Sequence, residues 1–121
     1  MSTLHRDGEG ITVFIKGAPE TILELCTDAL AAGGSTAVDK PARRAEAEAL
    51  AADGYRVLAL ATRRLDRLPD ELRAEEVEQA FTFLGFVALI DPPRPETAMS
   101  VALCRSAGIT PVMITGDHAA T

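Results

Sequence analysis

Lys16 and Gly17 are the first residues whose types and order suit phosphate chemistry. They follow the apolar, β-branched stretch 11–15. A lysine at the end of a strand can bring its ammonium to a phosphate, and a glycine beside it lets a ligand ring approach the backbone closely. Taken alone, the pattern also fits an ordinary strand-to-helix turn with a solvated lysine.

Arg56 is a second candidate for a phosphate contact. It lies two residues after Gly54 and begins the apolar stretch 57–61. A guanidinium at the start of a strand can reach an anion held beside the sheet. For this residue on its own, a surface arginine is the alternative.

Thr115, Gly116 and Asp117 form a polar turn directly after the apolar stretch 109–114. Open α/β sheets bind ligands just beyond the carboxyl ends of their strands. Backbone N–H groups around a glycine can hold an anion at such a turn. The alternative is an ordinary loop in which Asp117 caps the next helix.

The other reactive side chains give no catalytic or metal-binding pattern. His5 and His118 lack metal-ligand spacing, and no Ser/His/Asp or Cys/His arrangement stands out. Cys26 and Cys104 fall in apolar helical patterns, which favours buried free thiols in a reducing compartment. The acidic stretch 71–78 fits a solvated helix face. The net charge of −6 argues against nucleic-acid binding, which needs clustered Lys and Arg.

Strands and helices that alternate along the chain must position these groups. Strands are predicted at 11–16, 55–62 and 81–90, the last as an apolar run buried on both faces. Helices are predicted from Pro19 to the pair Gly33-Gly34, from Asp39 to about Asp53 and, as a short acidic helix, within 69–80. This order indicates an α/β fold, and 121 residues are enough for a core without disulfides.

A proline-rich connector at 91–95 divides the chain. Its sequence, Asp-Pro-Pro-Arg-Pro, holds three prolines in five residues, and proline neither continues a central strand nor leaves its neighbour free to be helical. A helix from Pro95 to Gly108 and a strand at 109–114 are predicted to follow. We therefore place a domain boundary in this connector, between residues 1–90 and 91–121.

Taken together, four blocks of the sequence resemble the P-type cation-transporting ATPases, most of all the calcium-pump-like, type II branch. In the family's order they are Lys16-Gly17-Ala18-Pro19-Glu20, Gly54 to Ala61, Asp91-Pro92-Pro93-Arg94 and Met113-Ile114-Thr115-Gly116-Asp117. The resemblance implies the C-terminal part of the ATP-binding domain, with antiparallel strands and flanking helices, over 1–90. Over 91–121 it implies one helix and strand of a Rossmann-like phosphorylation domain of the haloacid-dehalogenase type.

The first two blocks imply the nucleotide site. By resemblance, Lys16 and Gly17 line the adenine pocket and Arg56 contacts the nucleotide phosphates. The implied cofactors of the intact protein are ATP and Mg²⁺. Such a pump transfers a phosphoryl group to an aspartate and couples the cycle to cation transport across a membrane.

The last two blocks imply the hinge and the phosphate loop. By resemblance, Asp91 and Arg94 lie at the hinge to the phosphorylation domain, and Thr115, Gly116 and Asp117 contact the γ-phosphate. The implied partners are ATP and the rest of the pump, and the implied location is the cytoplasmic face of a membrane.

Several parts of the family pattern are absent from these 121 residues. Neither the phosphorylation motif Asp-Lys-Thr-Gly-Thr nor the Gly-Asp-Gly-x-Asn-Asp loop that helps bind Mg²⁺ occurs. The family's adenine-stacking aromatic residue would lie before Met1. The longest apolar run, 83–90, is far shorter than the roughly 20 residues of a membrane span. We therefore expect an excised, soluble piece that does not hydrolyse ATP alone and binds it no better than about 1 mM.

Two other classes of protein are alternatives to the pump. A haloacid-dehalogenase-like phosphatase needs an Asp-x-Asp nucleophile at a strand end, and the sequence has none. A small non-catalytic nucleotide-binding or interaction domain would meet a partner through its acidic 63–79 region. The predicted strand at 109–114 has no sheet around it, which also suggests self-association with a second copy.

Overall fold

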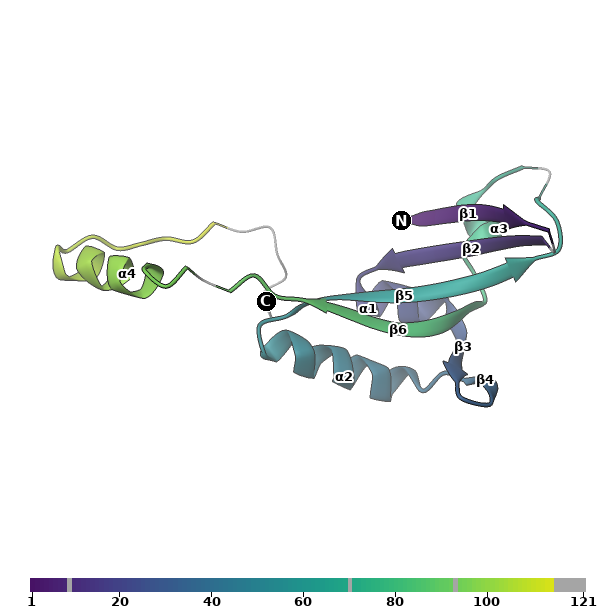
Figure 1. Ribbon diagram of the computed structural model, residues 1–121, viewed down its shortest axis with the longest axis horizontal. Helices are drawn as coiled ribbons and strands as arrows, with labels where there is room; N and C mark the ends of the chain where they lie inside the picture. The colour runs from purple at the N-terminus through teal and green to yellow at the C-terminus, as the bar shows by residue number, and fades with distance from the viewer. Residues whose placement is uncertain (9, 70, 93, 115–121) are drawn as a thin grey trace.

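The computed structural model describes residues 1–8, 10–69, 71–92 and 94–114. Its body is a six-stranded sheet with the strand order β1-β2-β5-β6-β3-β4 (Figure 1). The strands are β1 (Ser2–Asp7), β2 (Gly10–Gly17), β3 (Cys26–Ala31), β4 (Gly34–Ala37), β5 (Arg56–Leu65) and β6 (Phe81–Leu89). The helices are α1 (Pro19–Leu25), α2 (Lys40–Ala52), α3 (Ala74–Val77) and α4 (Thr97–Ser106). The α/β class predicted from the sequence is confirmed.

The long strands of the sheet are antiparallel. β2 pairs with β1 on one side and with β5 on the other, and β5 pairs with β6. β3 joins β6 in parallel through residues 81–83 and forms a hairpin with β4. The strands β1 and β4 have no counterpart among the sequence-based predictions, and they form the two edges of the sheet.

The hydrophobic core lies between α1 and one face of the sheet. Alternation along β2 turns Val13 and Ile15 toward this face, where Ile22 and Leu23 of α1 are buried. Phe81, at the start of β6, is the largest fully buried side chain. The period-2 pattern of β2 therefore sets which side of the sheet α1 covers.

The helix α2 begins where the sequence predicts and packs beside α1. The carboxylate of Asp39 accepts a hydrogen bond from the Ala42 N–H at 3.0 Å, which caps the first turn. Glu24 of α1 forms ion pairs with Lys40, at 3.5 Å, and with Arg44 of α2. These ion pairs connect α1 and α2 at their exposed surface.

The helix predicted from Pro19 to Gly33-Gly34 is wrong after Leu25. Cys26 takes extended backbone angles (φ −92°, ψ 139°) and begins β3. The apolar spacing of this segment is compatible with a helix, but pairing with β6 and β4 fixes it as a strand. Gly33-Gly34 therefore lies at a hairpin tip and does not end a helix.

The acidic helix predicted within 69–80 is reduced to the single turn α3. Val77 is buried in the core, and the acidic residues of this turn are exposed. The Arg63 guanidinium donates to the backbone oxygens of Glu76, at 3.0 Å, and Val77, at 3.2 Å. The arginine thus ties the turn to β5, and the segment needs no longer helix to stay in place.

β6 is a strand as predicted, but it is not buried on both faces. Phe81 and Phe83 are buried, whereas Leu84, Val87 and Leu89 are 39–48% exposed. The helices α1 and α2 contact the sheet from the core side, and within the described residues no helix covers the opposite face (Figure 1). We call this opposite side of β2, β5 and β6 the open face.

A β-bulge in β6 keeps Phe86 on the core side of the sheet together with Phe83. Leu60 pairs with Gly85 and Ala61 with Phe83, so Leu84 is an extra residue in β6. As a result Phe83 and Phe86 lie on the same side of the sheet, and their rings meet edge to face with centroids 5.0 Å apart. Gly85 has a φ of 149°, a backbone conformation that favours glycine.

The predicted helix before Gly108 is confirmed as α4, but the predicted strand at 109–114 is wrong. The described residues 109–114 have no strand pairing and their apolar side chains are exposed. A β-strand needs a neighbouring strand for its backbone hydrogen bonds, and none of the six strands of the sheet lies beside this segment (Figure 1). Pairing of 109–114 with a second copy stays a prediction. None of the described helices is long and apolar enough to cross a membrane.

Both cysteines are free thiols, as predicted, but only Cys26 is fully buried, and Cys104 is half-buried. Burial raises the pKa of Cys26 from 9.0 to about 11, although the positive charge of Lys40 acts in the opposite direction. The folded chain therefore holds this proton more tightly than the unfolded chain does.

The free energy of unfolding should consequently contain a Cys26 contribution that is present below pH 9 and is lost as the pH rises toward 11. Urea unfolding at pH 8 and pH 10.5 measures it, with Cys26→Ala for comparison. We expect stability to fall more with pH in the wild-type chain than in Cys26→Ala, and Cys104→Ala to behave like the wild type. Equal pH dependence in the wild type and Cys26→Ala would contradict the assignment.

Candidate functional site

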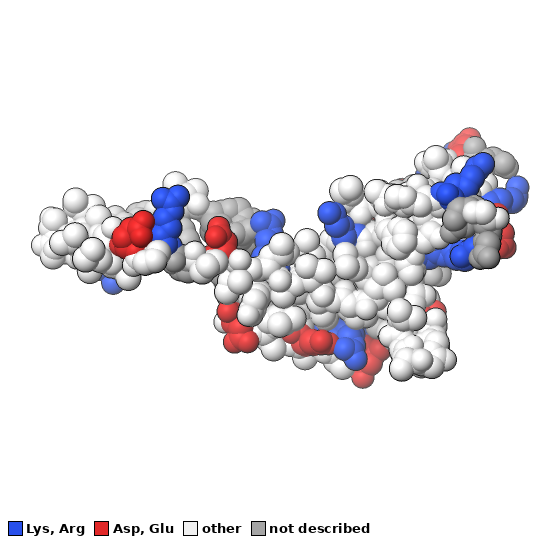
Figure 2. Space-filling view, viewed as in Figure 1, with Lys and Arg blue, Asp and Glu red and all other residues white. Residues whose placement is uncertain are grey.

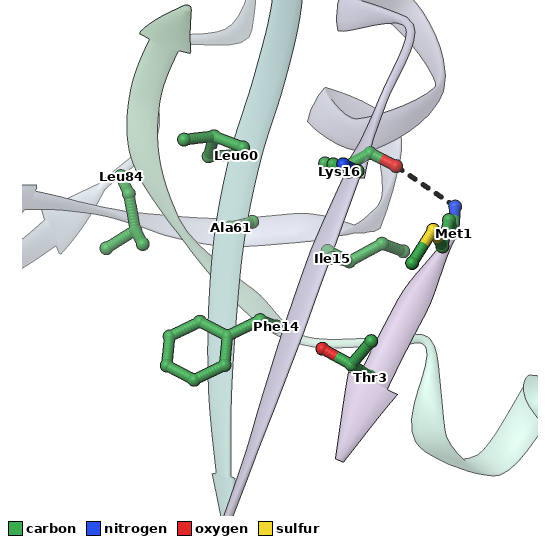
Figure 3. Close-up of a pocket in the computed structure, with 8 residues that line it drawn as sticks. All are labelled: Met1, Thr3, Phe14, Ile15, Lys16, Leu60, Ala61 and Leu84. Atoms are coloured by element: carbon green, nitrogen blue, oxygen red, sulfur yellow. Dashed lines mark hydrogen bonds between the residues drawn. The ribbon is translucent and has the colours of Figure 1, made fainter. Parts of the chain in front are cut away.

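A hollow of about 460 Å³ lies on the open face of the sheet (Figure 3). It is lined by Met1, Thr3, Phe14, Ile15, Lys16, Leu60, Ala61 and Leu84. Most of these residues are apolar, and Lys16 has the one charged side chain among them. Figure 2 shows uncharged side chains over the middle of this face and charged ones toward its margins.

Four strands bring the walls of the hollow together, with Thr3 contributed by β1. Alternation along β2 sends Phe14 and Lys16 to the open face, opposite to the buried residues on either side. Lys16 pairs with Leu60 of β5, so their side chains leave the sheet on the same side. Leu84 joins them because it follows the buried Phe83 on β6 and so leaves the sheet on the opposite side.

Lys16 is the group in the hollow that suits an anion. Its side chain is exposed, and within the described part of the chain no carboxylate forms an ion pair with its ammonium. Its backbone N–H donates to the Met1 carbonyl at 3.0 Å, which fixes the strand end beneath the side chain. The ammonium can therefore approach a phosphate held over the hollow.

Gly17 lies beside Lys16 but does not line the hollow. A Cβ at this position would meet Cδ1 of Ile22 at 3.2 Å. The missing side chain thus lets α1 approach the end of β2. The structure gives Gly17 a packing role, and its place in an adenine pocket stays a prediction.

Arg56 lies on the same face as Lys16, farther along the sheet. It is four residues before Leu60, the partner of Lys16, so the two backbone positions are about 13 Å apart along β5 at ~3.3 Å per residue. The structure therefore places both predicted cations on one face, with the leucines of β5 between them. The two backbone positions are separated along the face and do not lie next to each other.

The sequence alone and the comparisons with known proteins agree on where the chain belongs. A family model described as P-type ATPase, cytoplasmic domain N, matches residues 1–96. The chain belongs to the P-type cation-transporting ATPases. The resemblance drawn from the four sequence blocks is confirmed.

Curated relatives of this ATPase family match along 90–100% of the chain. The cation-transporting ATPase pma1 of Synechocystis is 38% identical over 122 residues, which is 100% of this chain and 13% of the relative. The sodium/potassium exporting P-type ATPase cta3 of Schizosaccharomyces pombe is 42% identical over 127 residues, 100% of this chain and 12% of the relative. The calcium-transporting ATPase of Bacillus subtilis is 38% identical over 113 residues, 90% of this chain and 12% of the relative. The chain thus spans about an eighth of the length of these ATPases.

The other predicted residues of this ATPase family lie away from the hollow. Asp91 and Arg94 are exposed, in a segment without helix or strand that follows β6. Thr115, Gly116 and Asp117 lie outside the residues that the structure describes. Among the described residues, no group of three or more His, Cys, Asp or Glu is arranged to hold a metal ion.

The sequence-based prediction missed the apolar walls of the hollow. Phe14 has a detectable signal, because it alternates with the buried Val13 and Ile15 and so belongs to the same face as Lys16. Leu84 has the same kind of signal, because it follows Phe83 and so alternates away from the buried Phe81 and Phe83. Strand pairing, which the residue pattern does not give, brings these side chains to one hollow.

Proposed function

We propose that this chain forms part of the ATP-binding domain of a P-type cation-transporting ATPase, and that the hollow on the open face holds the nucleotide. The observation that carries the proposal is the position of Lys16, whose ammonium stands at an apolar hollow. A nucleotide combines a flat, weakly polar base with a highly charged phosphate chain. The apolar floor of the hollow suits the base, and the adjacent cation suits the phosphates.

The order of residues along β5 supports one orientation of the nucleotide. The apolar surface of Phe14 and Leu60 suits the base, and Arg56, farther along the same face, suits the phosphates. Arg56 pairs with Leu89, the last residue of β6, so the phosphates would point toward the connector that begins at Asp91. In this proposal Asp91 and Arg94 are the hinge, and residues 91–121 begin the phosphorylation domain.

The complete reaction needs groups beyond this site. In the intact pump, Mg²⁺ and ATP would meet an aspartate of the phosphorylation domain, and the transfer would form an aspartyl phosphate that drives cation transport. Thr115, Gly116 and Asp117 would contact the γ-phosphate. The rest of the pump is the proposed partner, and the proposed place of this chain is the cytoplasmic side of a membrane.

Replacing Lys16 by alanine should weaken binding of Mg·ATP about tenfold, because an N–H···O bond from an ammonium to phosphate is lost. The difference should shrink at high salt, since the side chain is exposed and its charge is screened. Isothermal titration calorimetry of the two proteins at low and high salt measures both effects.

Lys40→Ala is the matched control for this measurement. Lys40 is a lysine of α2 that is paired with Glu24 and does not line the hollow. It should leave the affinity for Mg·ATP unchanged. Equal affinity in Lys16→Ala and the wild-type chain would remove Lys16 from the site and with it the proposed location of the nucleotide.

A further inference from the structure

Gly17, the last residue of β2, belongs to the core side of the sheet and not to the hollow. The residues of β2 alternate between the two faces, so Gly17 is on the same side as the buried Ile15, and Lys16 is on the open face. The strand partner of Gly17 is Ala59, which is fully buried. A side chain at position 17 would therefore point away from a ligand that Lys16 contacts.

The space that such a side chain would need is occupied by Ile22 of α1. A Cβ built on Gly17 would lie 3.2 Å from Cδ1 of Ile22 and 3.5 Å from its Cγ1. The distance to Cδ1 is shorter than an ordinary van der Waals contact, whereas the distance to Cγ1 is not. Cδ1 of Ile22 is thus the atom that a methyl group at position 17 would displace.

Ile22 has little room to move away. It is 2% exposed and belongs to the core cluster, together with Val13 and Leu23. Close-packed cores do not accept added volume without a shift of side chains or backbone. The Ile22 N–H also donates to the Ala18 carbonyl at 3.0 Å, which holds it to the start of α1. A methyl group at Gly17 would therefore displace the first turn of α1 or the end of β2.

The connection between α1 and Lys16 is short and stiff. Gly17 and Ala18 are the two residues between Lys16 and Pro19, the first residue of α1. Proline fixes its own φ and restricts the residue before it, so this connection has little freedom to absorb a shift. Ala18 gives α1 no side-chain cap. The packing of Ile22 against Gly17 is therefore one of the contacts that hold the start of α1, and with it the backbone of Lys16, in place.

We propose that Ile22 is a positioning residue for the phosphate contact, because it fills the space next to Gly17 and so fixes the end of β2 from which the Lys16 ammonium reaches a phosphate. In this proposal position 17 is a glycine so that α1 can pack against the strand, and not so that a ligand ring can approach the backbone. The inference rests on the proposed function, since it takes Lys16 as the phosphate contact.

The test is a double-mutant cycle in the 121-residue chain, with Gly17→Ala, Ile22→Val and the two changes combined. Valine keeps the branched Cβ of isoleucine and lacks Cδ1. Gly17→Ala should bind both Mg·ATP and inorganic tripolyphosphate about fivefold more weakly, because the displaced Lys16 serves both ligands. Ile22→Val alone should change either affinity by no more than about twofold, and the combined variant should return to within about twofold of the wild type.

Nuclear magnetic resonance titration of the ¹⁵N-labelled chain measures these affinities. The same spectra give a readout without any ligand. The amide signal of Lys16 should be displaced in Gly17→Ala and should return toward its wild-type position in the combined variant. A residue that only stabilises the fold would not restore this signal.

Two controls make the same chemical changes elsewhere. Gly33→Ala, at a glycine with open space around its Cβ position, should leave both affinities unchanged. Ile11→Val removes the same methyl group from a buried isoleucine near the other end of β2. It should not rescue Gly17→Ala.

The outcomes separate this inference from the proposed function. If Gly17→Ala weakens ATP but not tripolyphosphate, and Ile22→Val does not restore ATP binding, the glycine serves the ligand and the positioning role is overturned. The role is also overturned if Gly17→Ala binds both ligands like the wild type while Lys16→Ala does not, and the proposed site then stands. If Lys16→Ala binds both ligands like the wild type, or neither ligand binds the wild-type chain, both proposals fail.

Discussion

Phe81→Ala should lower the free energy of unfolding by about 3–5 kcal/mol, the range for removing a buried phenylalanine from a core. Phe81 is fully buried at the start of β6, where β6 contacts both β3 and β5. Its removal loses apolar burial and leaves a cavity that paired strands cannot close without breaking backbone hydrogen bonds. For a small domain with a stability of about 5–15 kcal/mol, this is a large share of the total.

Urea unfolding followed by circular dichroism measures this effect. Leu30→Ala is the control, because Leu30 is an apolar residue that is 60% exposed, and it should change stability by no more than about 0.5 kcal/mol. If Phe81→Ala lowers the free energy of unfolding by less than about 1 kcal/mol, the core fills the space of the missing ring. That result would contradict the expectation.

Gly85→Ala should cost about 1–3 kcal/mol through backbone strain alone. The φ of Gly85 is 149°, and a Cβ built there meets nothing within 4 Å. Steric contact is therefore excluded as the cause, and only the conformation disfavours a side chain. The same bulge places Phe83 and Phe86 together, so a variant that straightens β6 would separate the two rings and turn one of them out of the core.

Gly33→Ala is the matched control for the bulge. Gly33 also has open space around its Cβ position, but its φ is outside the positive range that disfavours side chains. Its replacement should change stability by less than about 0.5 kcal/mol. Nuclear Overhauser contacts between the rings of Phe83 and Phe86 report whether the bulge persists. Equal stability of Gly85→Ala and Gly33→Ala would contradict the strained bulge.

Local patterns were enough to predict the elements that carry their own signals. The β-branched, apolar run 11–16, the helix start at Asp39 and the apolar run that begins at Phe81 lead to β2, α2 and β6. The segment 26–31 was mistaken for helix because its apolar spacing fits both periods and its strand pairs only with distant residues. The segment 109–114 was mistaken for a strand because its composition suits one, while a strand also needs a neighbour.

The sequence by itself determined the family, through short blocks such as Lys16-Gly17-Ala18-Pro19-Glu20, and it named Lys16 and Arg56 as candidate phosphate contacts. The tertiary structure alone decided that Phe14 and Leu84 share a hollow with Lys16. The reason is physical. Residue types and local order fix what a side chain can do, but strand register fixes which side chains from separate strands leave the sheet at the same place.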